Sequence, residues 1–460
     1  MKAPSGRGKG RREQSMDDRT ADKILSLSRD LKADAAEVFL RSSTSTTIEV
    51  KDQKVDAFER ARDIGVGLRV LVNGRTGFSY TTDLTEPSLR ELARSAVSGA
   101  RNTEPDPFAI IPARPSSPYQ TVNIFDPSIV ALSEQEQIGR VMAMEREAYA
   151  ADPRVRRIRK ASAGFSRAET LIANSHGASI SYRGTVASAS IEVVAEEKGE
   201  SQAGWEYDVK RYYGKLDIEE TGRKAARKAL DLLGACRIDS VKAPVVLEAS
   251  VAEEVLSIIA SGFSAENVQK KKSLFSGRLG SEVVSPLITI YDDGLLEGGL
   301  GSAPSDDELV PARKKTVIDR GVLALFLHNA RTANQDRTES TGNGVRGGFK
   351  GVPGVGVTNL YIAPGPVSPE ELIASTPRGL LVTEIMGAHT ANPISGDFSV
   401  GATGFWIEQG KKAYPVREIT IAGNILDLMK NVDAVCSDLR FSGRIGSPTL
   451  RIKELSIGGK

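Results

Sequence analysis

The sequence has few of the residue types on which secreted scaffolds and metal sites depend. Its 460 residues include two cysteines, Cys236 and Cys436, and three histidines. Two cysteines cannot build a disulfide framework, and so low a content is typical of a reducing compartment. We therefore expect a cytoplasmic protein.

Long apolar segments are also missing. No apolar run reaches the roughly 18 residues that a membrane-spanning helix requires. The first 15 residues contain five basic residues and no apolar run, whereas a signal peptide has an apolar core of roughly 7–15 residues. We expect residues 1–18 to form a disordered basic tail, or most of them to precede a true start at Met16.

Neither sign of charge is in large excess. The chain has 61 basic and 59 acidic residues, which gives a net charge of +2. Direct binding to nucleic acid or to a membrane surface is therefore not expected. The hydrophobic fraction of 40% and the charged fraction of 26% are those of an ordinary globular protein. The length is sufficient for two or three domains.

Residues 19–235 are predicted to form an N-terminal α+β domain of two helix–strands–helix units, at about 19–103 and 130–235. In the first unit, apolar residues alternate at positions 66, 68, 70 and 72, which is the period of a half-buried strand. Asn73-Gly74 follows and favours a type I′ hairpin turn. Six prolines between residues 104 and 127 indicate a linker over 104–129.

Capping residues predict where the helices of this domain begin. Thr85 precedes a helical pattern that continues to about residue 100. Ser133 and Glu136 have the spacing of a capping box at the start of the second unit. Asp217 precedes the helix that closes this unit.

Residues 236–460 are predicted to form a β-rich α+β domain. Ser250 and Glu253 are expected to cap a helix after a short buried strand. Further strands are expected at 283–291, 316–319, 322–328, 357–363, 379–384, 404–408, 417–422 and 449–455. Eight glycines between Gly342 and Gly365 suit a backbone that bends often and approaches another chain closely. The predicted fold class is α+β, with a two-unit N-terminal half and a sheet-rich C-terminal half.

The three histidines do not form a recognisable metal site. His176 lies in a predicted turn and His328 ends an apolar run, where solvated or structural roles are expected. His389 lies in a loop after an apolar strand, and both a functional and a structural role stay open for it. No two histidines have the spacing of H-E-x-x-H, and a zinc site would need ligands from separate segments.

Two further motifs are short and unspecific. Residues 342–347 match G-x-G-x-x-G, but more glycines and Pro353 follow instead of the helix that would hold a pyrophosphate. Lys270, Lys271 and Lys272 suit the end of a helix, where cations complement the helix dipole. Neither motif predicts a nucleotide-binding site.

Several blocks of the C-terminal half resemble the TldD/PmbA family. They are Thr341–Gly344 with Arg346, Thr358–Ile362, Gly379–Glu384, Ser395–Ser399, Gly404–Glu408 and Glu418–Asn424. Each block is short, but as a set they are specific. The resemblance extends over nearly the whole chain from about residue 20.

Catalytic members of that family place H-E-x-x-x-H on a helix between a Val-rich strand and a segment like Ser273–Gly277. Both flanking segments are present here, with Leu256 and Ser261 where the histidines would be and Ser257 in place of the glutamate general base. Leucine cannot bind zinc, and serine is a poor ligand. The catalytic members also recruit a cysteine near the C-terminus; Cys436 lies in a comparable region, but one ligand makes no site. The resemblance therefore indicates the PmbA (TldE)-type, non-catalytic subunit, with no cofactor in this chain.

The resemblance implies a heterodimer with a TldD-like catalytic subunit, which would carry the zinc. The implied substrates are flexible or unfolded peptides, including leader segments removed during peptide maturation, and the chain alone could form a homodimer. Two alternatives stay open. One is an independent metal-dependent hydrolase built from His389, Cys436 and a carboxylate. The other is a regulatory, protein-binding subunit without a peptidase role.

Candidates to face the peptide or the partner come from the glycine-rich segment and the loop around residue 397. They are Asn343, Arg346, Thr358, Asn359, Tyr361, His389, Asp397 and Phe398. Arg346 suits a carboxylate or a carbonyl because its guanidinium is a planar fork of donors. The alternative is that these residues brace the ends of strands.

Overall fold

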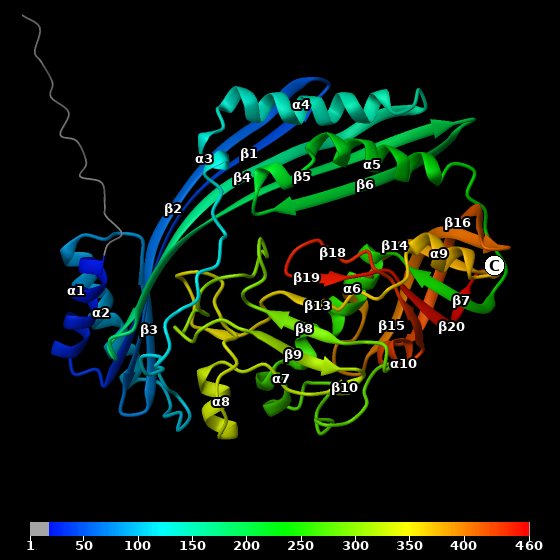
Figure 1. The fold of residues 1–460 in the computed structure, drawn as a ribbon. Coiled ribbons are helices and arrows are strands. Elements are labelled where there is room, and N and C mark those ends of the chain that lie inside the picture. Colours follow the sequence, from blue (N-terminus) through cyan, green and yellow to red (C-terminus); the bar gives the residue numbers. More distant parts are fainter. Residues whose placement is uncertain (1–17, 460) are drawn as a thin grey trace, which may run out of the picture.

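The computed structural model of the chain describes residues 18–459. Residues 1–17 of the predicted tail lie outside this range. The fold is of the predicted α+β class, with long strands in the N-terminal half and several short strands in the C-terminal half. In Figure 1, the N-terminal sheet arches over the C-terminal half.

One six-stranded antiparallel sheet contains the strands of both N-terminal units. In spatial order its strands are β3 (Arg75–Thr81), β2 (Lys54–Val72), β1 (Ala35–Lys51), β4 (Val155–Asn174), β5 (Ser179–Glu197) and β6 (Glu200–Lys210). β1 and β4 pair from Glu37 opposite Asn174 to Val50 opposite Ala161, and this pairing joins the two units. Asn73 and Gly74 have φ values of 50° and 71°, which confirms the predicted I′ turn between β2 and β3.

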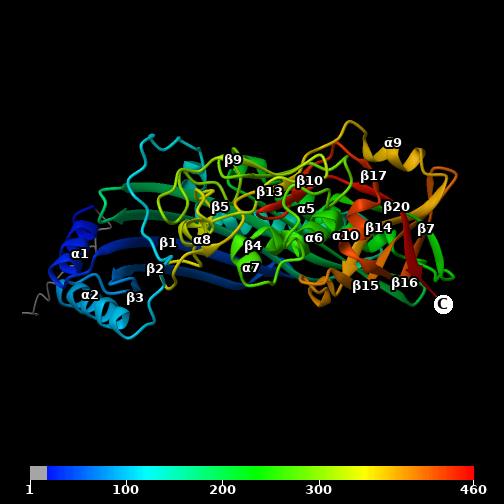
Figure 2. The same ribbon diagram turned by 90° about the horizontal axis from the view of Figure 1, so that it is seen from below.

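Helices cover the outer face of the sheet at its two ends. These are α1 (Asp18–Asp30) and α2 (Glu86–Arg101) at one end, and α3 (Pro127–Ala131), α4 (Glu134–Ala150) and α5 (Ile218–Asp231) at the other. Because side chains alternate along a strand, Val38 and Leu40 of β1 pack under α1 and α2, and Ile48 of the same strand packs under α4 and α5. Figure 2 shows α1 and α2 at one end of the molecule and the C-terminus at the other.

The C-terminal domain contains two larger sheets. One has the order β16 (Lys411–Asn424), β15 (Asp397–Glu408), β14 (Arg378–Met386), β7 (Val241–Leu247), β20 (Leu450–Gly458) and β17 (Val432–Val435), and β16 also pairs with β20, which closes a small barrel. The other has the order β10 (Val322–Leu323), β9 (Lys314–Asp319), β8 (Ile290–Asp293), β13 (Leu360–Ile362), β19 (Ile445–Ser447) and β18 (Arg440–Phe441). β11 (Gly344–Val345) pairs with β12 (Gly354–Val355) in the glycine-rich segment.

Helix α6 (Ala249–Ala260) lies in the main apolar core of this domain, with Val251, Val255 and Ile259 buried among strand residues. The shorter helices are α7 (Ala265–Gln269), α8 (Ala330–Asp336), α9 (Pro369–Ala374) and α10 (Ile425–Lys430). None of the helices in the described range 18–459 combines the length and apolarity needed to cross a membrane.

Two of the predicted helix caps are wrong, because the expected side chains do not form the capping hydrogen bonds. Thr85 stands at the N-cap of α2, but its hydroxyl does not cap the helix and instead donates to Asp83 at 3.0 Å. Helix α6 begins at Ala249, before Ser250, and the carboxylate of Glu253 accepts from the backbone N–H of Ser442 instead. The capping box of Ser133 and Glu136 and the Asp217 cap are confirmed.

Three predicted strands are shorter than expected, and the one expected at 357–363 spans only Leu360–Ile362. The strand expected at 283–291 begins at Ile290, and that expected at 322–328 ends at Leu323. After Leu323 the chain leaves the sheet, and the N–H of Leu327 donates to the carbonyl of Phe263 beyond α6. A contact distant in sequence therefore determines where this strand ends.

The inner face of the N-terminal sheet packs against the C-terminal domain. Phe39 and Ile172 point away from the helix-covered face and form an apolar cluster with Leu309 and Phe349. The linker takes part in this interface, since the Tyr119 hydroxyl donates to the carbonyl of Leu309 at 3.0 Å.

Two glycines of β2 allow Phe349 to approach the strand. A Cβ atom at Gly65 would lie 2.3 Å from a ring carbon of Phe349, and one at Gly67 would lie 2.3 Å from its carbonyl oxygen. A flexible ring can move away, but a backbone oxygen cannot move without its loop. A side chain at position 67 is therefore tolerated less well than one at position 65.

We predict that Gly67→Ala lowers the free energy of unfolding by about 1–3 kcal/mol, because the added methyl group overpacks this contact. Gly139→Ala is the matched control, since a Cβ atom there on exposed α4 meets nothing within 4 Å. Alanine in a helix interior should raise stability there by up to about 1 kcal/mol. Urea denaturation measures both variants, and an unchanged midpoint for Gly67→Ala would contradict the prediction.

Candidate functional site

Helix α6 occupies the position of the zinc-binding helix expected for a catalytic relative. Leu256 is fully buried in the main apolar core. Ser257 is exposed, and its hydroxyl donates to the carbonyl oxygen of Glu254 at 2.7 Å. Ser261 is also exposed and begins the short 3-10 turn η2 (Ser261–Phe263). Position 256 is thus a core position, and positions 257 and 261 face solvent.

Carboxylates lie near α6, but a zinc site also needs further ligands, typically histidine nitrogen or cysteine sulfur, that converge on one point. Burial raises the pKa of Glu254 to about 7, and the charges of Glu253 and Glu384 contribute to the rise. Within residues 18–459, no three His, Cys, Asp or Glu side chains are close enough together to hold a metal ion. The residues at these positions do not fit zinc.

Cys436 and His389, the two other predicted candidates for a metal site, have different environments. Cys436 is fully buried in an apolar cluster with Val246, Leu381 and Ile407. Burial raises the pKa of its thiol to about 12, which disfavours the thiolate that a metal requires. His389 is exposed on the turn η3 (Ala388–Thr390), which contacts α6.

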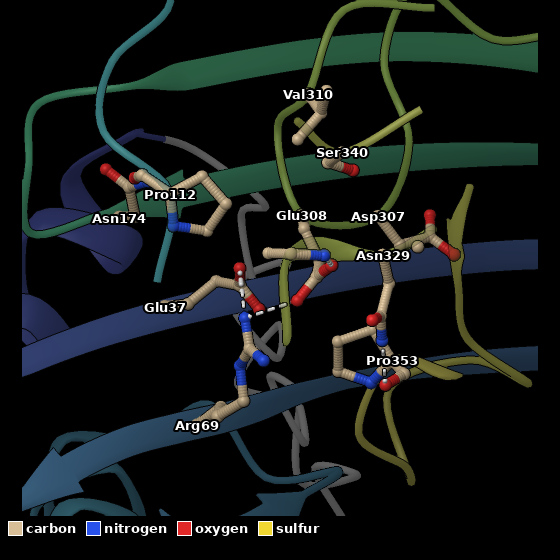
Figure 3. A network of polar contacts seen from close by, with 12 residues as sticks. Glu37, Arg69, Pro112, Asn174, Asp307, Glu308, Val310, Asn329, Ser340 and Pro353 are labelled. Carbon is tan, nitrogen blue, oxygen red and sulfur yellow. Dashed lines mark hydrogen bonds and ion pairs between the residues drawn. The ribbon is translucent and has the colours of Figure 1, made fainter. Parts of the chain in front are cut away.

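A row of alternating buried charges connects the two halves of the molecule (Figure 3). Nη2 of Arg69 lies 3.0 Å from a carboxylate oxygen of Glu37 and 2.9 Å from one of Glu308. The other oxygen of Glu37 pairs with Arg346. Glu37 and Arg69 are opposite each other on β1 and β2, whereas Glu308 and Arg346 come from loops of the C-terminal domain. Arg346 therefore binds a carboxylate, as its side chain suggested, but the carboxylate belongs to this chain.

Asn343 and Thr358 lie in a second buried network, around Asp292. One carboxylate oxygen of Asp292 accepts from the Thr358 hydroxyl, from the Asn343 amide and from Lys315, each at 2.8 Å. Its other oxygen accepts from the Thr358 backbone N–H at 2.7 Å. Asn343 and Thr358 thus hold the loops beside β8 together.

Asn359 and Tyr361 are also enclosed. The Asn359 amide donates to the carbonyl of Asp293, and its oxygen accepts from the N–H of Gly301 at 2.9 Å. Tyr361 packs between two other aromatic rings, Tyr291 and Phe441.

The eight candidate residues therefore fall into two groups. Six are buried, namely Asn343, Arg346, Thr358, Asn359, Tyr361 and Phe398, and two are exposed, namely His389 and Asp397. Arg346 and both asparagines form polar contacts within this chain, and a direct contact of any candidate with a partner or a peptide stays a prediction. Their contacts are those of bracing residues.

Three parts of the chain match models of the domains of one protein family. Residues 240–459 match the PmbA/TldA metallopeptidase C-terminal domain, residues 127–233 match the central domain, and residues 36–100 match domain 1. The chain is 30% identical over 432 residues to the metalloprotease PmbA of Escherichia coli O157:H7, with 93% of each chain covered. The chain belongs to the PmbA/TldD metallopeptidase family.

Further relatives agree with this assignment. The chain is 28% identical to the metalloprotease TldD homolog of Haemophilus influenzae, with 93% of each chain covered. It superposes with a TM-score of 0.89 on a Thermotoga maritima protein described as a proposed modulator of a DNA gyrase, which is 29% identical and covers 96% of this chain and 99% of that one. TldE from Thermococcus kodakarensis shares the fold, with a TM-score of 0.87, 23% identity and coverage of 96% and 100%.

Sequence reasoning singled out Arg346 in this PmbA/TldD family member but missed the other buried charges, Glu37, Arg69 and Glu308, although a signal exists for two of them. Glu37 is the one charged residue in the apolar run Ala35–Leu40, and Arg69 interrupts the run from Leu68 to Val72. A single charge within an apolar strand needs a buried partner. Two such charges opposite each other across a predicted hairpin indicate an ion pair.

We predict that Arg69→Met lowers the free energy of unfolding by about 3–5 kcal/mol, because it leaves the carboxylate of Glu308 buried without its ion-pair partner. Arg60→Met is the matched control on the same strand. Arg60 is exposed and pairs with Glu134 at 3.5 Å, and loss of such a surface pair costs about 0–1 kcal/mol. Urea denaturation distinguishes the variants, and equal losses for both would contradict the prediction.

Proposed function

We propose that this chain is the non-catalytic partner subunit of a heterodimeric PmbA/TldD-type zinc metallopeptidase that acts on flexible or unfolded peptides. A TldD-like subunit would hold the zinc ion and supply the metal-bound water that attacks the peptide bond. This chain would complete the substrate enclosure. Its two free cysteines are consistent with a cytoplasmic location.

The environment of Leu256 is the observation that carries this proposal. The side chain occupies a core position in α6, where the first histidine of the family motif would be. The serines at 257 and 261 supply neither an imidazole nor a carboxylate general base. The helix of the family is thus retained as a structural element, without the groups for metal-assisted hydrolysis.

The alternative of an independent hydrolase has little support from the donor groups. It requires His389, Cys436 and a carboxylate to converge, but Cys436 is enclosed by apolar side chains and His389 stands on an exposed turn. The purely regulatory alternative shares the absence of zinc ligands with our proposal. Measuring peptidase activity with a partner subunit separates the two.

Two exposed features would suit contacts with a partner or a peptide. The loop between β14 and β15 carries His389 and the apolar residue Ile394, which is 49% exposed, and the strand ends beside it carry Met386, which is 50% exposed, and Asp397. The strand β6 is an edge of the N-terminal sheet and carries Trp205, which is 55% exposed. An extended peptide can add to such an edge through backbone hydrogen bonds.

The purified chain is expected to contain much less than one zinc ion per chain and to leave an unstructured peptide intact. When it is co-purified with a TldD-like subunit from the same genome, chelator-sensitive cleavage is expected. Elemental analysis and a peptide digestion assay provide the measurements. Stoichiometric zinc together with cleavage by this chain alone would overturn the proposal, and a stable complex without peptidase activity would favour the regulatory alternative.

The loop between β14 and β15 is tested by Ile394→Asp, which places a charge on an exposed apolar position. We expect at least a tenfold loss of affinity for the TldD-like subunit, with little change in thermal stability, since surface changes shift stability by about 0.5 kcal/mol or less. Val130→Asp is the control, because Val130 is 41% exposed on α3 of the N-terminal domain. Unchanged affinity for Ile394→Asp would exclude this loop from the interface.

A further inference from the structure

A cavity lies between the inner face of the N-terminal sheet and the C-terminal domain. Its volume is about 300 Å³, and its lining comes from β1, β4 and β5 on one side and from loops within 294–312 and 342–346 on the other. Four arginines line it. Arg346 is paired with Glu37, and the other three are Arg41 on β1, Arg211 just after β6 and Arg444 just before β19. No residue of α6 is part of this lining, so the cavity is separate from the degenerate zinc position.

The three guanidinium groups are held differently. Arg211 is fixed in place, because it donates to three backbone carbonyl oxygens at 3.2, 2.5 and 3.3 Å. Arg41 and Arg444 are exposed. Within the described part of the chain, neither guanidinium group forms a hydrogen bond or an ion pair. Their donors are available to a ligand.

The negative charge of the cavity does not balance these arginines. Burial raises the pKa of Asp307 to about 6, and the charges of Arg444 and Arg41 oppose that rise. Burial also raises the pKa of Asp306. Besides Arg346, which is paired with Glu37, three guanidinium groups therefore share the cavity with one acid that is mainly ionised at neutral pH and one whose ionised form is disfavoured. The cavity attracts anions.

The remaining wall limits the size and character of a ligand. Ile124, Val186, Val345 and Val357 contribute apolar surface, and the volume is near the lower end of the range for small-molecule pockets, about 300–1,000 Å³. A small group with one oxyanion and a short apolar body fits these properties. A long charged chain would not be enclosed.

We propose that this cavity binds a small carboxylate or phosphate anion, held by Arg41 and Arg444 with Arg211 fixed beside them. The planar fork of arginine matches the two oxygens of either group, and such charge-assisted pairs are stronger than neutral hydrogen bonds. The anion has two candidate sources, a free small anion and the C-terminal carboxylate of a short peptide. The site does not depend on a metal or on the partner subunit.

Isothermal titration calorimetry on the purified full chain tests the site. The probes are inorganic phosphate, acetyl-trialanine with a free carboxylate, and the same peptide as its C-terminal amide. We expect millimolar or tighter binding of at least one anion and no binding of the amide. Phosphate binding alone identifies a free anion, and binding of the free-acid peptide alone identifies a chain terminus. Binding of neither anion would overturn the proposal.

Variants show where the anion binds. Arg41→Gln and Arg444→Gln should each weaken binding at least tenfold while leaving the melting temperature unchanged, because neither side chain has a hydrogen-bond or ion-pair partner among residues 18–459. Arg62→Gln is the matched control. Arg62 is exposed on β2 and lies opposite Thr44 of β1. Side chains alternate along a strand, and Thr44 is three residues from Arg41, so Thr44 and Arg62 lie on the face of the sheet opposite Arg41.

The Arg62→Gln variant also tests whether the anion binds instead on the outer face of the sheet. Arg62 lines a hollow of about 600 Å³ on the outer face, together with Arg60, Arg167 and Arg183. Binding within twofold of wild type in Arg62→Gln supports the inner cavity. Binding that is lost in Arg62→Gln, or weakened equally in all three variants, would show an outer-face site or a bulk charge effect and would overturn the proposal.

Discussion

The arrangement of the two halves of this protein depends on a row of buried charges. Glu37 and Arg69 belong to the N-terminal sheet, Glu308 and Arg346 belong to loops of the C-terminal domain, and each charge has an opposite partner. Burying such groups costs several kcal/mol per ion, which is offset only when every partner is in place. A shift of the sheet against the domain would leave charges unpaired in an apolar surrounding. The row therefore acts chiefly by excluding other arrangements of the two halves.

This constraint explains the role of the glycine-rich segment. Its loops must place Arg346 against Glu37 and Phe349 against β2, where Gly65 and Gly67 leave room. At the same time Asn343 must reach Asp292. A backbone with few side chains can satisfy these contacts within a short stretch. The cavity with Arg41 and Arg444 lies beside the same loops, so the contacts that join the halves also shape the candidate anion site.

The sequence predicted the features whose causes lie close together along the chain. The Asn73-Gly74 turn and the Ser133–Glu136 capping box are examples, because neighbouring residues determine their geometry. The single sheet made from both units was not predicted, since β1 and β4 pair across more than one hundred residues. The candidate site was predicted less well. Asn343, Arg346 and Asn359 have polar side chains that suit a binding surface or a buried network equally, and only the three-dimensional contacts show that they are internal.

At Leu256, Ser257 and Ser261, where the family motif would place its zinc ligands and general base, the sequence and the structure give complementary information. The sequence shows that ligands are missing, and the structure shows what the position does instead. Leu256 contributes to the core around Val255 and Ile259, so the helix gains apolar burial where a catalytic relative would place an imidazole. A histidine at 256 would need a polar partner in that core, and within residues 18–459 no three His, Cys, Asp or Glu side chains are close enough together to hold a metal ion. Stability of this helix and metal binding at this position therefore oppose each other.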